Sequence, residues 1–365
     1  MPVTGYTERR ARAADACRAH GVAAILAGPG SDLTYLTGYR IHTSERLTCL
    51  VLPAEGEPRL VVPGLEAPRA RLAAPDLALC EWQETDDPHA LAASLVTGDG
   101  AVAVGDQLWS AFLLRLQERL PGRRFRPASD LLRGLRMRKD PQEIAALRAV
   151  AEGADRAYAR ALSLDFEGRR ERDVAEALAA LLRSEGHDEV AFTIVASGAN
   201  GASPHHSTGD RVLARGDTVV MDFGGTMDAY CSDITRTVRV GAAEDEAQRV
   251  HDVVLRAQEA GYAAARAGAR AEEVDVAARY VIDVAGYGAF FIHRLGHGIG
   301  LDGHEHPYLV SGNGERLEPG MAFSIEPGIY LPGRFGVRIE DIAFIAPDGR
   351  AEPLNRADRA FATVA

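Results

Sequence analysis

Residues 213–222 read LARGDTVVMD, and residues 317–326 read LEPGMAFSIE. The two stretches share one frame, which is a leucine, a glycine three positions later and a carboxylate six positions after the glycine. The carboxylates, Asp222 and Glu326, each end a run of residues typical of a buried strand. The repeated frame predicts that the two stretches form similar strands.

A candidate hairpin follows each stretch. If the chain reverses around Met227–Asp228, Asp222 lies opposite Asp233. If it reverses around the glycine of LPGRF, Glu326 lies opposite Glu340. Turn-forming residues stand at or near both midpoints. The sequence therefore predicts two hairpins, each with a pair of carboxylates on one face.

Directly opposed side chains on such hairpins have Cβ atoms about 4.5–5.5 Å apart, and the residues around these carboxylates are apolar. Two buried carboxylates at that separation repel each other, so each pair needs a shared proton, a nearby arginine or a cation between its members. Two such pairs in one chain favour cations. Four carboxylates match the charge of two divalent ions, and mostly oxygen ligands suit Mn²⁺ better than a structural zinc site.

Residues 293–309 read HRLGHGIGLDGHEHPYL and contain four of the eleven histidines. Glycines surround His297, which allows a close approach of the backbone. We expect His297 to complete a two-metal site, and His304 to be either a second functional histidine or a surface residue. Two metal ions about 3.5–4 Å apart activate water and polarise a carbonyl group, so the predicted chemistry is hydrolysis of a carbonyl-type bond.

The composition narrows the range of partners and compartments. The chain has 365 residues and a net charge of −11, with dispersed basic residues, so nucleic acid and anionic membrane surfaces are not expected partners. No run approaches the ~18 apolar residues of a membrane span. The N-terminal stretch MPVTGYTERR lacks the apolar core of a secretory signal, and the four cysteines are far apart. These features predict a cytoplasmic protein with reduced thiols.

The chain changes character near residue 137. Before it, apolar runs at 22–26, 47–52, 60–62 and 101–104 alternate with helical patterns, which predicts a three-layer α/β domain over residues 1–136. After it, Asp140, Pro141 and Glu143 form a capping-box-like helix start. Further helices are expected near 171–185, 244–267 and 271–285, with strand pairs between them. We expect an α+β domain over residues 137–365.

Six motifs lie between residues 137 and 357: RKDPQEI, SGANGASPHHSTGD, MDFGGTMDAYCSDITRT, HRLGHGIGLDGHEHP, SIEPGIY and GVRIED. In this order and spacing, the chain resembles the pita-bread metallopeptidases, and most closely their proline-peptidase branch of Xaa-Pro dipeptidase (prolidase) and aminopeptidase P. The resemblance implies a catalytic pita-bread domain of the creatinase/aminopeptidase type with pseudo-twofold halves. The first 136 residues resemble the N-terminal domain of the creatinase family more loosely.

The resemblance also implies metal ligands. Asp222 and Asp233 would bind metal, with Asp233 bridging, His297 and Glu326 would bind the second ion, and Glu340 would bridge both. Two divalent ions per subunit are implied, with Mn²⁺ as the first choice and Co²⁺ or Zn²⁺ as alternatives.

The resemblance assigns further residues to the substrate. His206, His304 and Glu326 would be catalytic, with Glu326 as the proton shuttle. His206, His293, His304 and Arg338 would contact the substrate. The implied activity is hydrolysis of Xaa-Pro bonds in short proline-containing peptides by a homodimer, with Xaa-Pro dipeptidase as the first choice. Aminopeptidase P acting on longer peptides, or a non-enzymatic peptide-binding module on the same fold, are the alternatives.

Three details remain open in the sequence. His205 and His206 are adjacent, and we favour His206 as the inward-facing imidazole because of its position after SP. Gly303 stands where the proline branch usually has Val or Ile, so the pocket wall is expected to be looser there. Arg338 either pairs with the C-terminal carboxylate of a dipeptide or forms an ion pair with Glu340 or Asp341.

Overall fold

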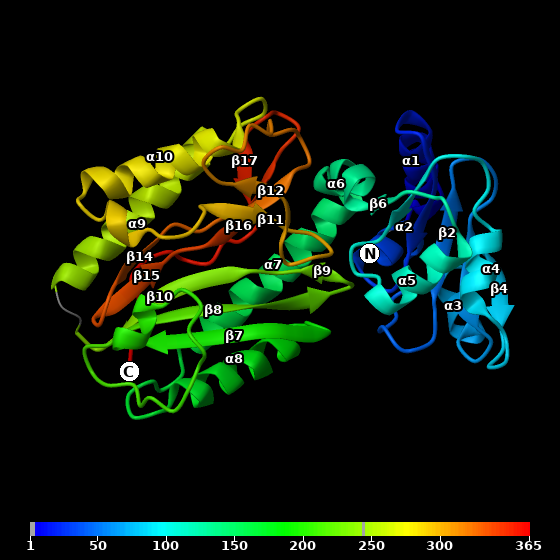
Figure 1. Ribbon diagram of the computed structural model, residues 1–365. Coiled ribbons are helices and arrows are strands. Elements are labelled where there is room, and N and C mark those ends of the chain that lie inside the picture. The colour runs from blue at the N-terminus through cyan, green and yellow to red at the C-terminus, as the bar shows by residue number, and fades with distance from the viewer. Residues whose placement is uncertain (1–3, 243–244) are drawn as a thin grey trace. The chain divides into compact units, whose positions relative to one another are not determined.

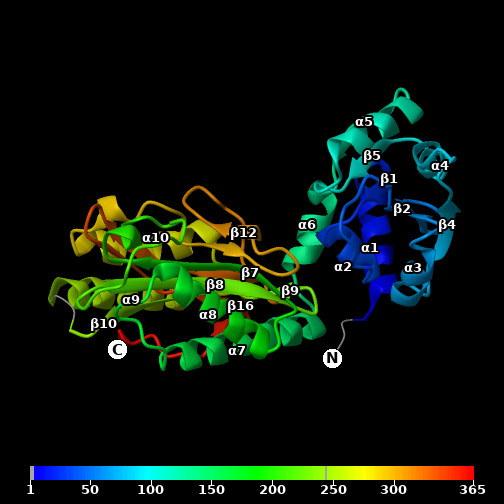
Figure 2. The same ribbon diagram turned by 90° about the horizontal axis from the view of Figure 1, so that it is seen from below.

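The computed structural model describes residues 4–242 and 245–365. Within these ranges the chain divides into two compact units, and the division falls between Arg136 and Met137. Figures 1 and 2 show the course of the chain through both units. None of the helices in the described ranges is long and apolar enough to cross a membrane.

The N-terminal unit is built on a six-stranded mixed sheet with the order β4-β3-β2-β1-β5-β6. Its strands are β1 Val22–Ala27, β2 Cys49–Pro53, β3 Arg59–Pro63, β4 Ala78–Trp82, β5 Ala101–Val104 and β6 Phe125–Pro127. Its helices are α1 Tyr6–Ala19, α2 Ser31–Thr37, α3 Ala67–Ala73, α4 Pro88–Ser94 and α5 Ser110–Arg119, and α6 Ser129–Met137 follows. The central strand β1 is buried along its whole length, as a strand covered on both faces must be. The predicted three-layer α/β arrangement is confirmed.

The first half of the C-terminal unit consists of two helices and a sheet. The helices are α7 Pro141–Ala161 and α8 Glu171–Ser184, and α7 begins with the predicted capping box of Asp140 and Glu143. The sheet has the order β18-β10-β8-β7, with β9 paired to β8. Its strands are β7 Glu189–Ser197, β8 Thr218–Met227, β9 Tyr230–Cys231, β10 Ile234–Val240 and β18 Thr363–Val364. Both helices pack on this sheet around one apolar core.

The second half repeats this plan. Helices α9 Asp245–Ala264 and α10 Ala271–Val284 pack beside a sheet with the order β12-β11-β13-β16-β17 (Figures 1 and 2). The strands are β11 Gly296–Gly298, β12 Glu305–Leu309, β13 Ala322–Ile325, β16 Asp341–Ile345 and β17 Ala351–Pro353. A two-stranded ribbon of β14 Gly328–Leu331 and β15 Phe335–Arg338 extends from it. Two helices followed by a sheet, twice, are the predicted pseudo-twofold halves.

The predicted strand register is correct for the second hairpin and wrong for the first. In the second hairpin, Ile325 pairs with Asp341 and Gly328 with Arg338, which is the predicted register. In the first hairpin the prediction is wrong, because Asp222 pairs with Thr235 instead of Asp233.

The turn of the first hairpin explains the difference. Asp228 and Ala229 have φ of 50° and 72° and form a two-residue loop between the paired residues Met227 and Tyr230. The reversal therefore lies one residue later than predicted. Because the partner shifts by two positions, Asp233 keeps its predicted face of the sheet.

Candidate metal centre

The C-terminal unit contains a cavity of about 560 Å³. Its wall combines acidic, imidazole and apolar side chains from both halves. They are Phe192, Ile194, Pro204, His205, Asp222, Asp233, His293, Arg294, His297, His304, Glu326, Arg338 and Glu340. All five predicted metal ligands are among them.

One strand interior and three strand ends place the four carboxylates at this cavity. Asp222 lies within β8, whereas Asp233 directly precedes β10, and Glu326 directly follows β13. Glu340 directly precedes β16, and its backbone N–H donates to the carbonyl oxygen of Thr235 at 3.0 Å. This contact is an isolated bridge between the two halves. The halves therefore meet where the carboxylates meet.

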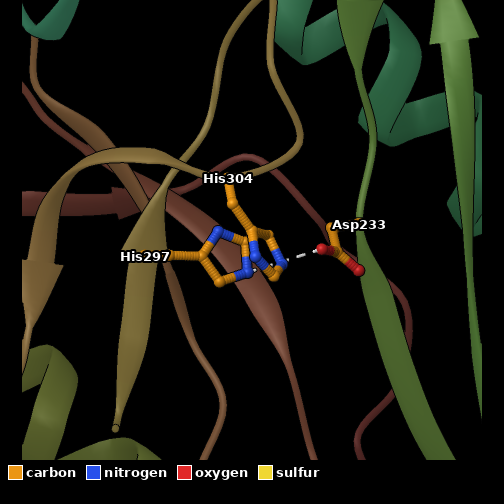
Figure 3. Close-up of side chains that lie close together, drawn as sticks. All are labelled: Asp233, His297 and His304. Atoms are coloured by element: carbon orange, nitrogen blue, oxygen red, sulfur yellow. Dashed lines mark ion pairs between the residues drawn. The ribbon is translucent and has the colours of Figure 1, made fainter. Parts of the chain in front are cut away.

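The side chains form overlapping groups with the spacing of metal ligands. One ligand atom from each of Asp222, Asp233 and Glu340 lies within 4.8 Å of the others, and the same holds for His297, Glu326 and Glu340. A third such group joins Asp233 and His297 to His304, and Figure 3 shows the two imidazoles side by side with Asp233 facing them. The predicted ligands from distant segments thus converge, with Glu340 shared by two groups.

The imidazole of His297 is prepared for a metal ion. Its Nδ1 lies 3.1 Å from the carbonyl oxygen of Gly298, so Nδ1 carries the proton and donates. The free Nε2 lies 3.4 Å from Glu326 and 3.6 Å from Asp233. Burial lowers the pKa of His297 to about 3, and His304 adds to the shift. A neutral imidazole with one nitrogen held by the backbone is the form that binds metal.

The glycines beside His297 allow the close backbone approach that was predicted. A Cβ atom at Gly296 would lie 2.0 Å from the carbonyl oxygen of Ser324. A Cβ atom at Gly298 would lie 2.2 Å from the carbonyl oxygen of His306. Any side chain at these two positions would push β11 away from its neighbours and move His297.

The carboxylates are in an environment that disfavours negative charge. Burial raises the pKa of Asp233 and of Glu340 well above the usual range, and the nearby carboxylates Asp222 and Asp233, respectively, raise it further. Burial also raises the pKa of Glu326 to about 7, with Arg338 opposing the shift and Asp222 adding to it. The cluster therefore lacks positive charge.

Two carboxylate oxygens without hydrogen-bond partners show where positively charged ions can bind. Oδ1 of Asp222 and Oδ1 of Asp233 are buried and have no hydrogen-bond partner among the described residues. Other oxygens of the cluster are held, since Thr235 Oγ1 donates to Glu340 Oε2 at 2.6 Å and Ser324 Oγ donates to Glu326 Oε1 at 3.1 Å. A buried carboxylate oxygen without a partner is costly unless it binds a cation. The donor set fits two divalent metal ions.

Arg338 holds this cluster in place and donates hydrogen bonds from all three of its guanidinium nitrogens. Its guanidinium donates to Asp222 Oδ2 at 2.6 Å and to Thr235 Oγ1 at 3.0 Å. It also donates to Tyr330 Oη at 2.9 Å and to the carbonyl oxygen of Pro204 at 3.3 Å. The sequence left open an ion pair of Arg338 with Glu340 or Asp341. In the structure its ion-pair partner is Asp222. Arg338 lines the cavity, but its guanidinium is engaged within the protein.

His293 borders the cavity as a neutral ring. Its Nδ1 lies 2.7 Å from the carbonyl oxygen of Arg294 and its Nε2 lies 2.8 Å from Tyr330 Oη, so both nitrogens have partners. Burial lowers its pKa to about 3, and Arg338 adds to the shift. The rings of Phe291 and His293 are perpendicular, with 5.1 Å between their centroids. His293 is therefore a neutral ring of the cavity wall whose two nitrogens are already engaged.

The prediction that His206 faces the cavity is corrected by the structure. His205 lines the cavity, whereas Nε2 of His206 lies 3.0 Å from Glu171 Oε2. The two histidines are adjacent in the sequence. Glu171, at the start of α8, binds His206, so the imidazole of His205 is the one at the cavity. His304 is exposed and does line the cavity, with its ring 3.8 Å from that of His297.

Other features of the site were missed from the sequence. Thr235, Ser324 and Tyr330 form hydrogen bonds with Glu340, Glu326 and Arg338, respectively. Nothing in the sequence marked these three residues except that they lie in or near the motifs. Arg294 could have been noticed, because it lies within HRLGH. A Cβ atom at Gly303 would meet nothing within 4 Å, and the expectation that the missing side chain loosens the pocket wall stays a prediction.

Comparison with known proteins agrees with this geometry. Residues 145–347 match the model of metallopeptidase family M24, and residues 9–138 match that of the creatinase/prolidase N-terminal domain. A probable dipeptidase PepE of Mycobacterium bovis is 48% identical over 94% of this chain and 93% of its own length. An Xaa-Pro dipeptidase of Pyrococcus furiosus is 36% identical over 83% of this chain and 86% of its own. The crystal structure of a prolidase from Thermococcus sibiricus superposes with a TM-score of 0.94 at 36% identity, covering 99% of this chain and 100% of the other.

Proposed function

The chain belongs to metallopeptidase family M24, and from that premise we propose that it hydrolyses the bond between the two residues of Xaa-Pro dipeptides. The observation that carries the proposal is the convergence of Asp222, Asp233, His297, Glu326 and Glu340 on one cavity. The names of its relatives, a dipeptidase and an Xaa-Pro dipeptidase, support the substrate class.

Two divalent ions fit the five ligands, and Mn²⁺ is the ion we propose. Asp222, Asp233 and Glu340 would hold one ion, and His297, Glu326 and Glu340 the other, with Asp233 also bridging. When bound, such ions polarise the scissile carbonyl group and lower the pKa of the attacking water. Four carboxylates and one neutral imidazole suit a hard or borderline ion.

The remaining steps belong to side chains of the cavity. Glu326 would accept the proton of the attacking water and return it to the prolyl nitrogen, which becomes the amine of the product. That nitrogen carries no hydrogen in the substrate, so the pocket needs no acceptor for it. Phe192, Ile194 and the neutral ring of His293 line the cavity, and we propose that they contact the pyrrolidine ring. His205 and His304 would donate hydrogen bonds to the carbonyl oxygen as it gains charge.

Arg294 supports a preference for dipeptides. Four of the five N–H donors of Arg338 are used within the protein, so we assign Arg338 a structural role and look elsewhere for the cation that binds a substrate carboxylate. Arg294 lines the cavity and, within the described ranges, contacts His304 Nδ1 at 3.3 Å and the ring of Tyr308 at 4.4 Å but no carboxylate. The C-terminal carboxylate of a dipeptide is only one residue, about 3.8 Å, beyond the scissile bond. We propose that Arg294 binds this carboxylate, which a longer peptide lacks at that position.

Further assignments accompany this function. We propose an N-terminal domain over residues 1–136 and a catalytic domain over residues 137–365. The four cysteines are unpaired, which supports a reducing compartment such as the cytoplasm. The family resemblance supports a homodimer, and light scattering of the purified protein would test it.

A peptide panel tests the function directly. Metal-depleted protein is supplied with Mn²⁺, Co²⁺ or Zn²⁺ and assayed on Xaa-Pro, Xaa-Pro-Yaa and Xaa-Ala peptides. We expect turnover of Xaa-Pro, with Xaa-Ala as the negative control and Asp233→Ala as the variant that loses metal and activity together. Preference for Xaa-Pro-Yaa would favour an aminopeptidase. Absence of bound metal after Mn²⁺ treatment would favour a peptide-binding module, and near-normal activity of Asp233→Ala would refute the metal assignment.

A further inference from the structure

Glu171 is a buried carboxylate outside the metal centre. It is the first residue of α8, and its exposed fraction is 0%. Its carboxylate accepts hydrogen bonds from the backbone N–H of Ser197 at 2.7 Å, from Ser197 Oγ at 2.8 Å and from Asn200 Nδ2 at 3.0 Å. It also accepts from His206 Nε2 at 3.0 Å and from the backbone N–H of Gly209 at 3.4 Å. Burial raises its pKa, but these hydrogen bonds outweigh burial and lower it overall.

These donors all belong to one segment of the chain. The segment leaves β7 at Ser197, turns through the 3₁₀ helix Gly198–Ala202 and carries His205 before it reaches Gly209. Glu171 therefore binds the segment at its beginning, at His206 and near its end. An ionised carboxylate can only accept, so Nε2 of His206 carries a proton and donates to it.

His205 lies between two fixed neighbours. On one side, the carbonyl oxygen of Pro204 accepts a hydrogen bond from Arg338 at 3.3 Å. On the other side, His206 is held by Glu171. The backbone N–H of His206 donates to the carbonyl oxygen of Ser203 at 3.3 Å, so Pro204 and His205 form the middle of a turn. From this turn the side chain of His206 contacts Glu171, and that of His205 lines the cavity.

We propose that Glu171 and His206 form a positioning pair that fixes His205 at the cavity. The inference rests on the proposed function, in which His205 contacts the substrate. The pair itself is not placed to reach the substrate, because neither Glu171 nor His206 is among the residues that line the cavity. Its loss would let His205 move, and a misplacement of about 1 Å at a reacting centre reduces catalysis on the order of 100-fold.

Adjacent variants separate positioning from simple loss of stability. His206→Leu removes the donor, whereas His206→Gln keeps an N–H that can reach Glu171. We expect His206→Leu to lower kcat/KM for Xaa-Pro about 10–100-fold, mainly through kcat. We expect His206→Gln to stay within about threefold of the wild type. In a His205→Ala background, His206→Leu should add little further loss, because the residue it positions is gone. An equal loss in both backgrounds would overturn the proposal.

A readout without substrate keeps the inference separable from the peptidase assignment. Ring signals of ¹³C-labelled histidines in metal-free protein are recorded by NMR, and the His205 signal is assigned by its loss in His205→Ala. We expect the His205 signal to shift or broaden in His206→Leu and in Glu171→Gln, and to keep its position in His206→Gln. An unchanged His205 signal in His206→Leu would refute the positioning role, whatever the activity of the protein. If the signal changes but the wild type hydrolyses no Xaa-Pro peptide, the proposed function fails and the positioning pair stands.

Discussion

Replacing Glu326 with glutamine should stabilise the metal-free protein while it removes the response to metal ions. Glu326 has a side chain that is 15% exposed, and its Oε1 lies 3.4 Å from Nε2 of His297. A glutamine fits the same space, and its carbonyl oxygen can still accept from Ser324 Oγ. Glutamine lacks the negative charge of Glu326. That charge destabilises the metal-free protein, but it is needed to bind a metal ion.

The pKa of Glu326 sets the size of the effect. The folded protein raises it to about 7 from an ordinary 4.5, so the folded state binds the proton more tightly than the unfolded chain does. The resulting stability is present below pH 4.5 and is lost as the pH rises to about 7. At about 1.36 kcal/mol per pKa unit, the loss at pH 8 is about 3 kcal/mol, and at pH 5 it is below about 1 kcal/mol.

Thermal unfolding of both proteins after metal removal measures this difference. At pH 8, Glu326→Gln should melt about 6–12 °C above the wild type, given about 2–4 °C per kcal/mol for a unit of this size, and the gap should nearly close at pH 5. Added Mn²⁺ should raise the melting temperature of the wild type and leave that of the variant almost unchanged. If Glu326→Gln is no more stable than the wild type at pH 8 without metal, the electrostatic reasoning about this cluster is wrong.

Three further outcomes are expected. Arg294→Met should reduce the preference for Xaa-Pro over Xaa-Pro amide about 10–100-fold in kcat/KM, as loss of a charged hydrogen bond predicts, and an unchanged ratio would exclude Arg294 as the carboxylate site. Gly303→Val should leave kcat/KM within about twofold and stability within about 0.5 kcal/mol, because its side chain would enter open space; a large loss in the same peptide assay would contradict that. His251 is buried against Phe361 with a pKa lowered by burial to about 4, so the wild type should lose up to about 3 kcal/mol as the pH falls from about 6.5 to about 4. His251→Phe should lack this dependence when unfolding is followed against pH, and an identical pH profile for both proteins would count against it.

The metal centre was accessible from the sequence because it follows from charge and strand geometry. Asp222 and Glu326 each followed a strand-like apolar run in the sequence, and each had an acidic residue across a predicted hairpin. Opposed buried carboxylates require a compensating charge whatever the details of the fold. The exact register of the first hairpin was not required for that conclusion, because a shift of two residues keeps side chains on the same face.

The error in that register has a local cause. A turn was expected around Met227–Asp228, but the two residues with positive φ are Asp228 and Ala229. Aspartate adopts this conformation fairly readily, whereas alanine rarely does. No glycine or asparagine therefore marked the true turn. The surrounding strand pairing holds Ala229 in a conformation that its own preference does not indicate.

Side-chain direction was less predictable, since it depends on partners from distant segments. SPHH requires only that one of two adjacent imidazoles turns away from the cavity. Glu171, at the start of α8, decides that it is His206. Arg338 is a parallel case: its partner Asp222 lies on a distant strand and could not be read from the motif GVRIED. If Arg294 is the cation that binds the substrate carboxylate, as proposed, the choice between dipeptides and longer peptides depends on contacts between distant segments and not on any single motif.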